Sequence, residues 1–335
     1  MPTPINLSAS RAGAILGMSN YSTPLQVWLQ IMESREPGFC EKNNYKIPEF
    51  EYNSAMKWGH AFESAVIELA EEKQGCKIID RERFYQNNEL TCHLDGRYEF
   101  YDIGLHEGKT TSAQYFYSAF GEPGTDRVPV EYQLQCQHQM ICTGAEKVIL
   151  SVLVFPKRVE EFEAEGWTPI LHEKGYYYLY NESKKKATTP ENWAITFNDI
   201  GNFHQYVITA HADLQKLMLE AYADFWNNHV LTGVPPEPKN YDDIRAICRE
   251  PVGTIIATPE INSLISEYKQ IGSEISSTGT LAKRREQLKT QILNFSRTAG
   301  FTEDDESRDK WIIRSQDGKK LASYGRDKNN NFIFR

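Results

Sequence analysis

The chain has 335 residues, of which 40% are hydrophobic and 25% are charged, as in ordinary soluble globular proteins. Its net charge of −9 excludes a surface that is basic all over, although local basic patches could still contact nucleic acid. No apolar run approaches the roughly 18 residues needed to span a bilayer, and the N-terminus lacks the pattern of a signal peptide, so we expect no membrane association. The six scattered cysteines include no C-x-x-C pair, which indicates reduced thiols in a cytoplasmic protein.

Helical patterns dominate the first 75 residues. Two short helices are predicted within residues 8–33, and the second begins at Pro24, a residue suited to a first helical turn. Residues 34–51 are predicted to form a polar loop. A longer helix follows over about residues 54–75, where apolar side chains recur at helical spacing and Glu63 lies beside their stripe.

Strands and helices then alternate along the chain. Strand-like runs occupy about residues 77–85 and 90–109, and a helix is predicted from about Pro129 to Thr143, with Asp126 as its cap. The run at 147–155 is rich in Val, Ile and Leu, which is typical of a buried strand. This order of helix, strands, helix and strand indicates an α/β core.

The second half of the chain is more varied. Residues 156–190 are hydrophilic and are predicted to form an insertion or a hairpin, and a long helix is predicted over 199–232. One or two amphipathic helices follow over 258–299, and two or three short strands from Lys310 onward.

A domain boundary is predicted near residue 235. Gly233 and the three prolines just after it end the long helix. We therefore predict one domain over 1–235 and a C-terminal extension over 236–335, made of helices and then short strands.

The strongest chemical signal lies at 93–111, in the stretch HLDGRYEFYDIGLHEGKTT. Asp95 lies at a turn, and Glu107 and Lys109 share a face of the predicted strand because side chains two residues apart point the same way. Tyr101, Ile103 and Leu105 would extend this face. A buried carboxylate and ammonium must pair or hold a metal, and two carboxylates with a lysine make a Mg²⁺ site of the type that cuts phosphodiesters.

A simpler interpretation of Glu107 and Lys109 is a surface ion pair worth under ~1 kcal/mol. Similar acid-x-Lys triplets recur in the chain, for example at Glu71 and Lys73. The turn upstream and the glutamine-rich helix downstream favour the site.

The predicted helix at 129–143 carries a polar stripe. Glu131, Gln135, His138 and Cys142 follow one another at spacings of four, three and four residues, which places them on one face. Without further evidence this stripe could equally make ordinary hydrogen bonds.

Several phrases together resemble the YqaJ-type viral recombinase family, relatives of the bacteriophage lambda exonuclease within the PD-(D/E)xK nuclease superfamily. These phrases are SASRAGAILGMSNYSTPLQVW, MKWGHAFESAV, HLDG, HEGKTT, GEPGTDRVP and YQLQCQHQMICTG, and a later one is AYADFWNNHVLTGVPPEP. Their order and spacing carry the resemblance, which covers about half to two thirds of the chain.

The resemblance implies a restriction-endonuclease-like α/β core, a central mixed sheet flanked by helices, within a nuclease domain over 1–235. It also implies an exonuclease that digests linear double-stranded DNA from a 5′ end and leaves 3′ single strands for a strand-annealing partner in homologous recombination. Mg²⁺ would be the cofactor, with Mn²⁺ able to substitute. The expected assembly is a homo-oligomeric ring, with a trimer favoured, in the cytoplasm of a bacterial or phage-infected cell.

The same resemblance implies a catalytic set that comprises Glu63, Asp95, Glu107, Lys109 and Gln135. The three carboxylates would bind the metal, and the lysine would lie beside the attacking water. Gln135 matches the glutamine of the helix after the catalytic strand.

Three further residues are predicted to contact DNA, namely Ser10, Arg11 and His138. Ser10 matches a position that touches the terminal phosphate. The sequence departs from the family pattern at Leu94, where a proline is expected before the aspartate, and at His138, where a tyrosine is expected.

Two alternatives stay open. The first is an endonuclease of the same superfamily, of restriction or CRISPR-adaptation type, and the second is a non-catalytic protein that binds DNA ends. The presence of Asp95, Glu107 and Lys109 together disfavours the second.

Overall fold

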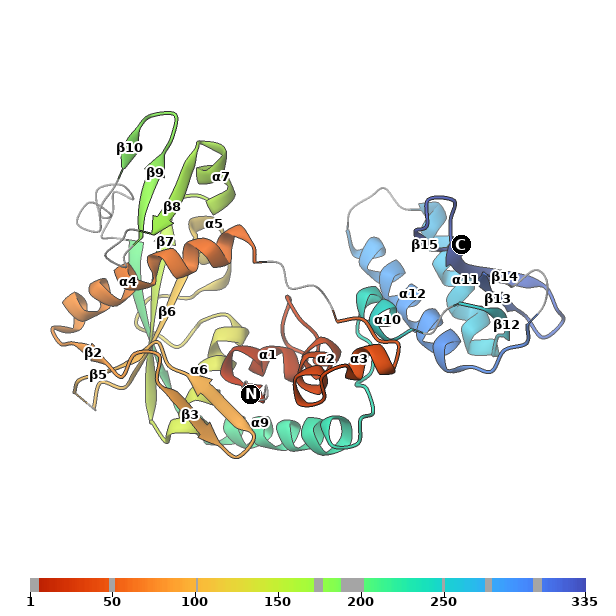
Figure 1. The fold of residues 1–335 in the computed structure, drawn as a ribbon, viewed down its shortest axis with the longest axis horizontal. Coiled ribbons are helices and arrows are strands. Elements are labelled where there is room, and N and C mark those ends of the chain that lie inside the picture. The colour runs from red at the N-terminus through yellow and green to blue at the C-terminus, as the bar shows by residue number, and fades with distance from the viewer. Residues whose placement is uncertain are drawn as a thin grey trace. The chain divides into compact units, whose positions relative to one another are not determined.

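A computed structural model describes residues 6–47, 52–100, 102–171, 177–187, 202–248, 251–274, 279–303 and 309–335 (Figure 1). Within these ranges, no helix has the length and apolar character needed to cross a membrane. The chain divides into two compact units. The first comprises Thr3–Tyr21 and Glu49–Trp226, and the second comprises Ser22–Pro48 and Asn227–Arg335. The predicted boundary near residue 235 stays a prediction, and the grouping of Ser22–Pro48 with the C-terminal residues was not expected from the sequence.

The first unit is built on a five-stranded sheet with strand order β11-β7-β6-β5-β2. Its strands are β2 (Ile78–Ile79), β5 (Gly96–Tyr98), β6 (Leu105–Ser112), β7 (Lys147–Phe155) and β11 (Phe203–Thr209). The β6 and β7 strands pair in parallel, whereas the other neighbours pair antiparallel, so the sheet is mixed.

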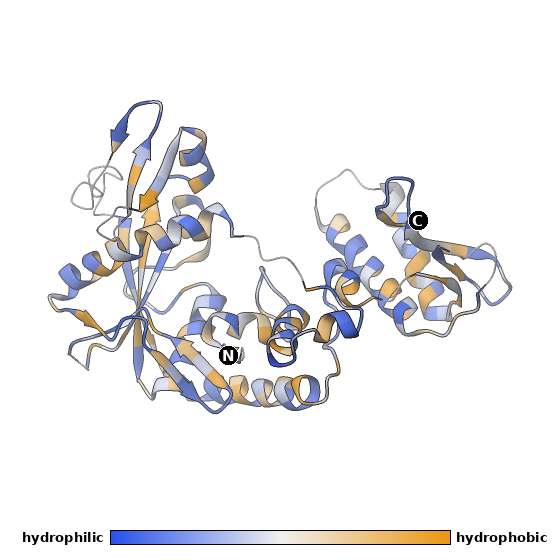
Figure 2. Cartoon of the chain, in the orientation of Figure 1, coloured by the Kyte–Doolittle hydropathy of each residue, from blue (hydrophilic) through white to orange (hydrophobic). Residues whose placement is uncertain are grey.

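Two helices cover the two faces of this sheet: α4 (Ser54–Gln74) and α6 (Val130–Thr143). Each face of the sheet has its own hydrophobic core. Alternate side chains of β7 belong to different cores, because successive strand side chains point to opposite faces. Leu153 packs in the core that contains Phe62 of α4, and Val152 packs in the core that contains Met140 of α6. The predicted α/β fold with a central mixed sheet and flanking helices is confirmed, and Figure 2 shows hydrophobic and hydrophilic residues interleaved along its helices.

The predicted strand over 90–109 is broken into three pieces, namely β4 (Leu90–His93), β5 and β6. The chain turns before β6 at Gly104, which has a φ of +112° and lies so close to the carbonyl of Lys147 that a Cβ would be 2.6 Å from that oxygen. The strand face that carries Glu107 therefore begins at Leu105 and does not reach back to Ile103, while Tyr101 lies outside the described residues.

Smaller elements complete the first unit. They are β1 (Leu7–Ser8), η1 (Ala9–Arg11), α1 (Ala12–Ile15), β3 (Phe84–Asn87), α5 (Ala113–Ala119), α7 (Val159–Ala164), β8 (Trp167–Leu171), β9 (Tyr177–Asn181), β10 (Lys186–Ala187) and α9 (Ala212–Phe225). The strands β8, β9 and β10 pair antiparallel within the predicted insertion, of which residues 172–176 and 188–190 lie outside the described ranges.

The predicted helix over 199–232 is wrong in its first part, where β11 pairs along all seven of its residues with β7. Asp126 is not the cap of α6 either, because Pro129 occupies the N-cap position.

The second unit combines helices of 4 to 19 residues with a four-stranded sheet of order β12-β13-β14-β15. Its elements are α2 (Pro24–Arg35), α3 (Phe39–Lys42), α10 (Tyr241–Ile247), β12 (Gly253–Ile256), α11 (Pro259–Glu274), α12 (Thr280–Thr298), β13 (Lys310–Arg314), β14 (Lys320–Arg326) and β15 (Phe332–Phe334). A π-helical turn, η4 (Trp226–Val230), follows α9. The predicted start of α2 is confirmed, and Thr23 caps it, whereas the predicted polar loop over 34–51 contains α3.

Candidate active site

The β5 and β6 strands bring Asp95 to Glu107. Gly96 pairs with His106 in the antiparallel register, and Asp95 comes just before Gly96, so this pairing brings Asp95 beside Glu107 and Gly108. The backbone N–H of Gly108 donates to Oδ2 of Asp95 at 2.8 Å, which holds the bend before β5 against β6.

The Glu107 carboxylate is almost fully buried, with 2% of the side chain exposed, and three side chains donate to it. Nε2 of Gln135 lies 2.5 Å from Oε1, and Nε2 of Gln139 lies 2.5 Å from Oε2. The ammonium of Lys109 donates to Oε1 from two residues along β6. Each oxygen therefore has a fixed donor, so the carboxylate has one orientation.

Burial and charge change the acidity of the two neighbours of Glu107. Desolvation, followed by the negative charge of Glu107, raises the pKa of Asp95 to about 7. For Lys109, burial favours the neutral amine, but the charges of Glu107 and Asp95 outweigh burial and raise its pKa above the usual value. Lys109 therefore stays a cation near neutral pH. The surroundings of Asp95 disfavour its charged form, so a nearby positive charge would stabilise the Asp95 carboxylate.

Glu63 comes from the face of α4 that packs on β6. Gly59 and Val66 of the same face approach β6 at Thr110 and Gly108. The Glu63 side chain is 38% exposed, and one of its oxygens lies 3.5 Å from Nδ1 of His60. The negative charge of Glu63 raises the pKa of Asp95, but by less than burial and the charge of Glu107 do.

The residues present fit a hard divalent cation only in part. Asp95 and Glu107 supply carboxylate oxygens, which Mg²⁺ and Mn²⁺ prefer as ligands. Burial and the charge of Glu107 disfavour the ionised form of Asp95, and a bound cation would stabilise that form. Among the described residues, however, no three side chains of His, Cys, Asp or Glu lie together as a metal-binding group. The three-carboxylate set with Glu63 therefore stays a prediction.

The predicted DNA contacts Ser10 and Arg11 lie together on η1, which packs against α6. Ser10 is exposed, and its Oγ lies 3.3 Å from Oγ of Ser8. The guanidinium of Arg11 donates to the Ser8 hydroxyl at 3.5 Å. Burial lowers the pKa of Arg11, and no carboxylate lies within ion-pair distance of it in the part of the chain that the structure describes. This half-buried cation can accept an anion.

His138 offers no surface to DNA, because its ring is fully buried. Its Nε2 lies 3.1 Å from the carbonyl oxygen of Thr91, and Nδ1 lies 2.9 Å from the hydroxyl of Tyr222. A carbonyl only accepts, so Nε2 donates and Nδ1 accepts. The ring joins α6 to β4 and α9, and we leave it out of the DNA contacts predicted from the sequence.

Gln139 is the site residue that the sequence argument missed. It follows Gln135 by four residues on α6, which is the spacing that puts two side chains on one helix face. The polar helix face predicted from the sequence included His138 and did not include Gln139. The same spacing relates Gln133 and Gln137, so spacing alone does not select the pair that binds Glu107.

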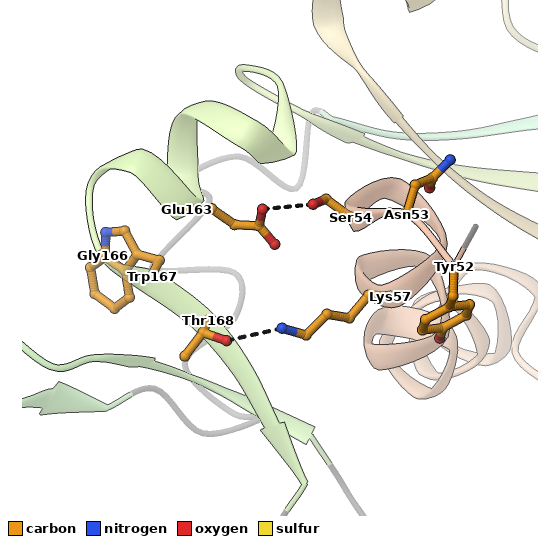
Figure 3. A pocket seen from close by; sticks show the side chains of 8 residues that line it. All are labelled: Tyr52, Asn53, Ser54, Lys57, Glu163, Gly166, Trp167 and Thr168. Atoms are coloured by element: carbon orange, nitrogen blue, oxygen red, sulfur yellow. Dashed lines mark hydrogen bonds between the residues drawn. The ribbon is translucent and has the colours of Figure 1, made fainter. Parts of the chain in front are cut away.

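A separate cavity of about 480 Å³ opens where the start of α4 faces α7 and β8 (Figure 3). Across it, Ser54 donates to Glu163 at 2.7 Å, and Lys57 donates to Thr168 at 3.3 Å. None of its lining residues belongs to the cluster around Glu107.

Residues 4–146 match the family model of the YqaJ-like viral recombinase domain. This part of the chain is similar to a YqaJ-like viral recombinase domain, and the match covers 143 of the 335 residues. The resemblance found in the sequence motifs is thereby confirmed, and the match contains Asp95, Glu107, Lys109 and both glutamines. No curated protein matches the chain.

Solved structures with similarity to the chain include two exonucleases. The alkaline exonuclease from Laribacter hongkongensis has a TM-score of 0.44 and 14% identity over 69% of this chain and 90% of that one. The same enzyme in complex with dAMP has a TM-score of 0.39 and 12% identity, again over 69% and 90%. A phage-related exonuclease from Haemophilus somnus 129PT has a TM-score of 0.38 and 13% identity over 69% of this chain and 97% of that one.

Proposed function

We propose that the chain is a metal-dependent exonuclease that digests one strand of linear double-stranded DNA from its 5′ end. The 3′ single strand that remains would serve homologous recombination by strand annealing. The observation that carries the proposal is the fixed, buried Glu107 carboxylate beside Asp95 and Lys109, within the residues that are similar to a YqaJ-like viral recombinase domain. The polarity and the recombination role come from the family resemblance.

Asp95 and Glu107 are the residues that would hold Mg²⁺, or Mn²⁺ in its place, and Glu63 would add an oxygen from α4. The ion, when bound, supplies positive charge for the phosphate and lowers the pKa of the attacking water. Because two amides hold both Glu107 oxygens, the carboxylate is oriented before any ligand arrives.

Lys109 acts as a cation in this proposal. Its raised pKa means that it holds its proton near pH 7, so it donates a hydrogen bond to the attacking water or to a phosphate oxygen. It also stabilises the negative charge that develops in the transition state. It does not serve as the general base.

Binding of the DNA end is proposed to involve Ser10 and Arg11. A desolvated guanidinium without a carboxylate partner among the described residues suits a terminal phosphate, which it can bind with two parallel hydrogen bonds. We also propose a homo-oligomeric ring, most simply a trimer, a single-strand annealing protein as partner, and a cytoplasmic location. These three rest on the family resemblance.

The proposal is tested with linear and closed circular duplexes of one sequence, incubated with Mg²⁺. We expect loss of the linear DNA alone, faster with a 5′ phosphate, and release of label from a 5′-labelled strand before a 3′-labelled one. Cutting of closed circles would instead identify an endonuclease, and inactivity on both substrates would favour a DNA-end binder. Asp95→Ala and Lys109→Ala should abolish digestion while binding of DNA ends persists, and retained activity would show that the site lies elsewhere.

A further inference from the structure

The small sheet of strand order β1-β4-β3 packs with one face on α6. On that face, Cys92 of β4 and Tyr85 of β3 lie in the core that contains Met140 of α6. Successive strand side chains point to opposite faces, and residues paired across two strands share a face. The face turned away from α6 therefore carries Ser8, Phe84, Gln86, Thr91 and His93.

Two aromatic rings lie side by side on this outward face. Phe84 and His93 are direct partners in the register of β3 and β4, and their ring centroids are 5.0 Å apart at an interplanar angle of 50°. Phe84 is 45% exposed, and His93 is exposed as well. A flat ligand that covers both rings would remove this apolar surface from water, and nucleobases stack on aromatic side chains in this way.

The same face includes the position where the proposed function places the terminal phosphate. Ser8 of β1 pairs directly with Thr91 of β4, and the guanidinium of Arg11 donates to the Ser8 hydroxyl at 3.5 Å. The Arg11 cation therefore lies at the β1 side of this face. Among the described strand residues of the sheet, none that points outward is Asp or Glu, so no fixed negative charge on this face opposes a phosphate.

The spacing between the cation and the rings suits a single nucleotide. His93 follows Thr91 by two residues, which is about 7 Å along the strand, and neighbouring strands lie about 5 Å apart. Ser8 and His93 are therefore separated by about 8 Å across the sheet. A nucleotide holds its phosphate and its base on two sides of one sugar, so it can bind at both places at once.

We propose that Phe84 and His93 form a stacking platform for the base of the 5′-terminal nucleotide, whose phosphate binds at Arg11. The placement of that phosphate rests on the proposed function. Every base has a π face, so the platform adds affinity for a DNA end without a sequence preference. His93 precedes Asp95 by two residues, so the base lies beside the strand that leads into the proposed active site.

The first test measures stacking itself. A short duplex carries the fluorescent analogue 2-aminopurine as its 5′-terminal base, and the protein is added in EDTA so that no strand is cut. We expect the wild type and Phe84→Tyr to quench the fluorescence, because both place a ring against the base, and Phe84→Leu to leave it unquenched. Phe100→Leu is the matched control, since Phe100 is 57% exposed but lies outside this sheet, and it should quench like the wild type. Equal quenching by Phe84→Leu and the wild type would overturn the platform.

The second test separates the base from the phosphate. Four duplex ends are compared, with and without a 5′ phosphate and with either a normal or an abasic terminal nucleotide. We expect the wild type to bind the end with a base about 5–100-fold more tightly than the abasic end. Phe84→Leu should lose this ratio and keep the preference for the phosphate, whereas Arg11→Gln should do the opposite. Equal affinity of the wild type for the two kinds of end would refute the platform even if no variant folds.

Failure of the platform and failure of the proposed function give different results. Quenching by a protein that does not digest DNA in Mg²⁺ would support the platform and remove the nuclease, and digestion without quenching would do the reverse. Light scattering tests a second copy of the chain as the competing occupant. We expect one mass for the wild type and Phe84→Leu, and a lower mass for the variant would show that the rings contact another copy instead of DNA.

Discussion

At the scale of single residues, a carboxylate as buried as Glu107 needs a donor for each oxygen, and α6 supplies two from one face. Gln139→Met keeps the volume of the side chain and removes the donor to Oε2, so we expect kcat to fall about 10–100-fold. Gln137→Met is the matched control, because Gln137 is as buried but bonds to Thr209, His211 and Gln215. That variant should lose thermal stability and keep its kcat. Similar kcat values for the two variants would contradict the role of Gln139.

The buried ring of His138 predicts a pH dependence of stability. Burial lowers the pKa of His138 to about 4, whereas the unfolded chain binds the proton with a pKa of roughly 6.5. The unfolded state therefore takes up protons first as the pH falls, and stability is complete above pH 6.5 and is lost between pH 6.5 and 4. At pH 5 the loss from this one ring is about 2 kcal/mol.

His138→Gln isolates this effect, because glutamine can still donate to the carbonyl of Thr91 but does not titrate in this range. The free energy of unfolding, measured with urea at pH 8 and pH 5, should fall by about 2 kcal/mol less in the variant than in the wild type. Asp95 and His106 titrate in both proteins and cancel in the comparison. An equal pH dependence in the two proteins would show that His138 is accessible to protons in the folded state.

Site residues could be predicted where a local pattern marks them. Asp95, Glu107 and Lys109 lie within fifteen positions, and a two-residue spacing on a strand is enough to put the last two on one face. Gln139 and Gln205 could not be found in this way, because the partners of their side chains lie on other elements. The position of Gln205 opposite Ser151 is set by the register of β11 on β7.

At the scale of elements, β11 shows why a helix was predicted where a strand forms. The segment FHQYVIT is short and is followed at once by the helix α9, so its own pattern was read as the start of that helix. Its alternation of buried and exposed residues appears only against β7, to which every one of its residues pairs. Pairing with β7 therefore makes this segment a strand, whatever helical pattern its local sequence has.

Ile208 and Val207 test this strand directly. Ile208 is fully buried in the core beside α6, whereas Val207 is 38% exposed. We expect Ile208→Ala to lower the free energy of unfolding by about 2–5 kcal/mol and Val207→Ala to lower it by less than about 1 kcal/mol. The measurement is the urea midpoint of each variant at a constant slope. Equal losses would contradict the alternation of a strand.

At the scale of the whole molecule, the charge distribution bears on how DNA would be retained. The net charge is −9, and residues 281–335 carry 13 Lys and Arg against 8 Asp and Glu, so the acidic excess lies in the first 280 residues. The proposed nuclease site belongs to this acidic part. A single copy therefore attracts DNA weakly at long range. Enclosure of the duplex by a ring would retain DNA without strong attraction.

A ring and a purely electrostatic clamp respond differently to salt. A protein held by 6–10 phosphate contacts loses about 10³–10⁵ in affinity between 50 and 200 mM salt, whereas a closed ring must open to leave. We expect loading onto DNA ends to weaken steeply with salt, while the run length of complexes already loaded falls less than about threefold over the same range. The run length is measured on end-labelled duplex after an excess of unlabelled linear DNA is added with the salt. Light scattering should give three times the 38.6 kDa chain mass. Two results together would contradict the ring: a monomeric mass, and a run length that falls with salt as steeply as loading does. The protein would then hold DNA by charge alone.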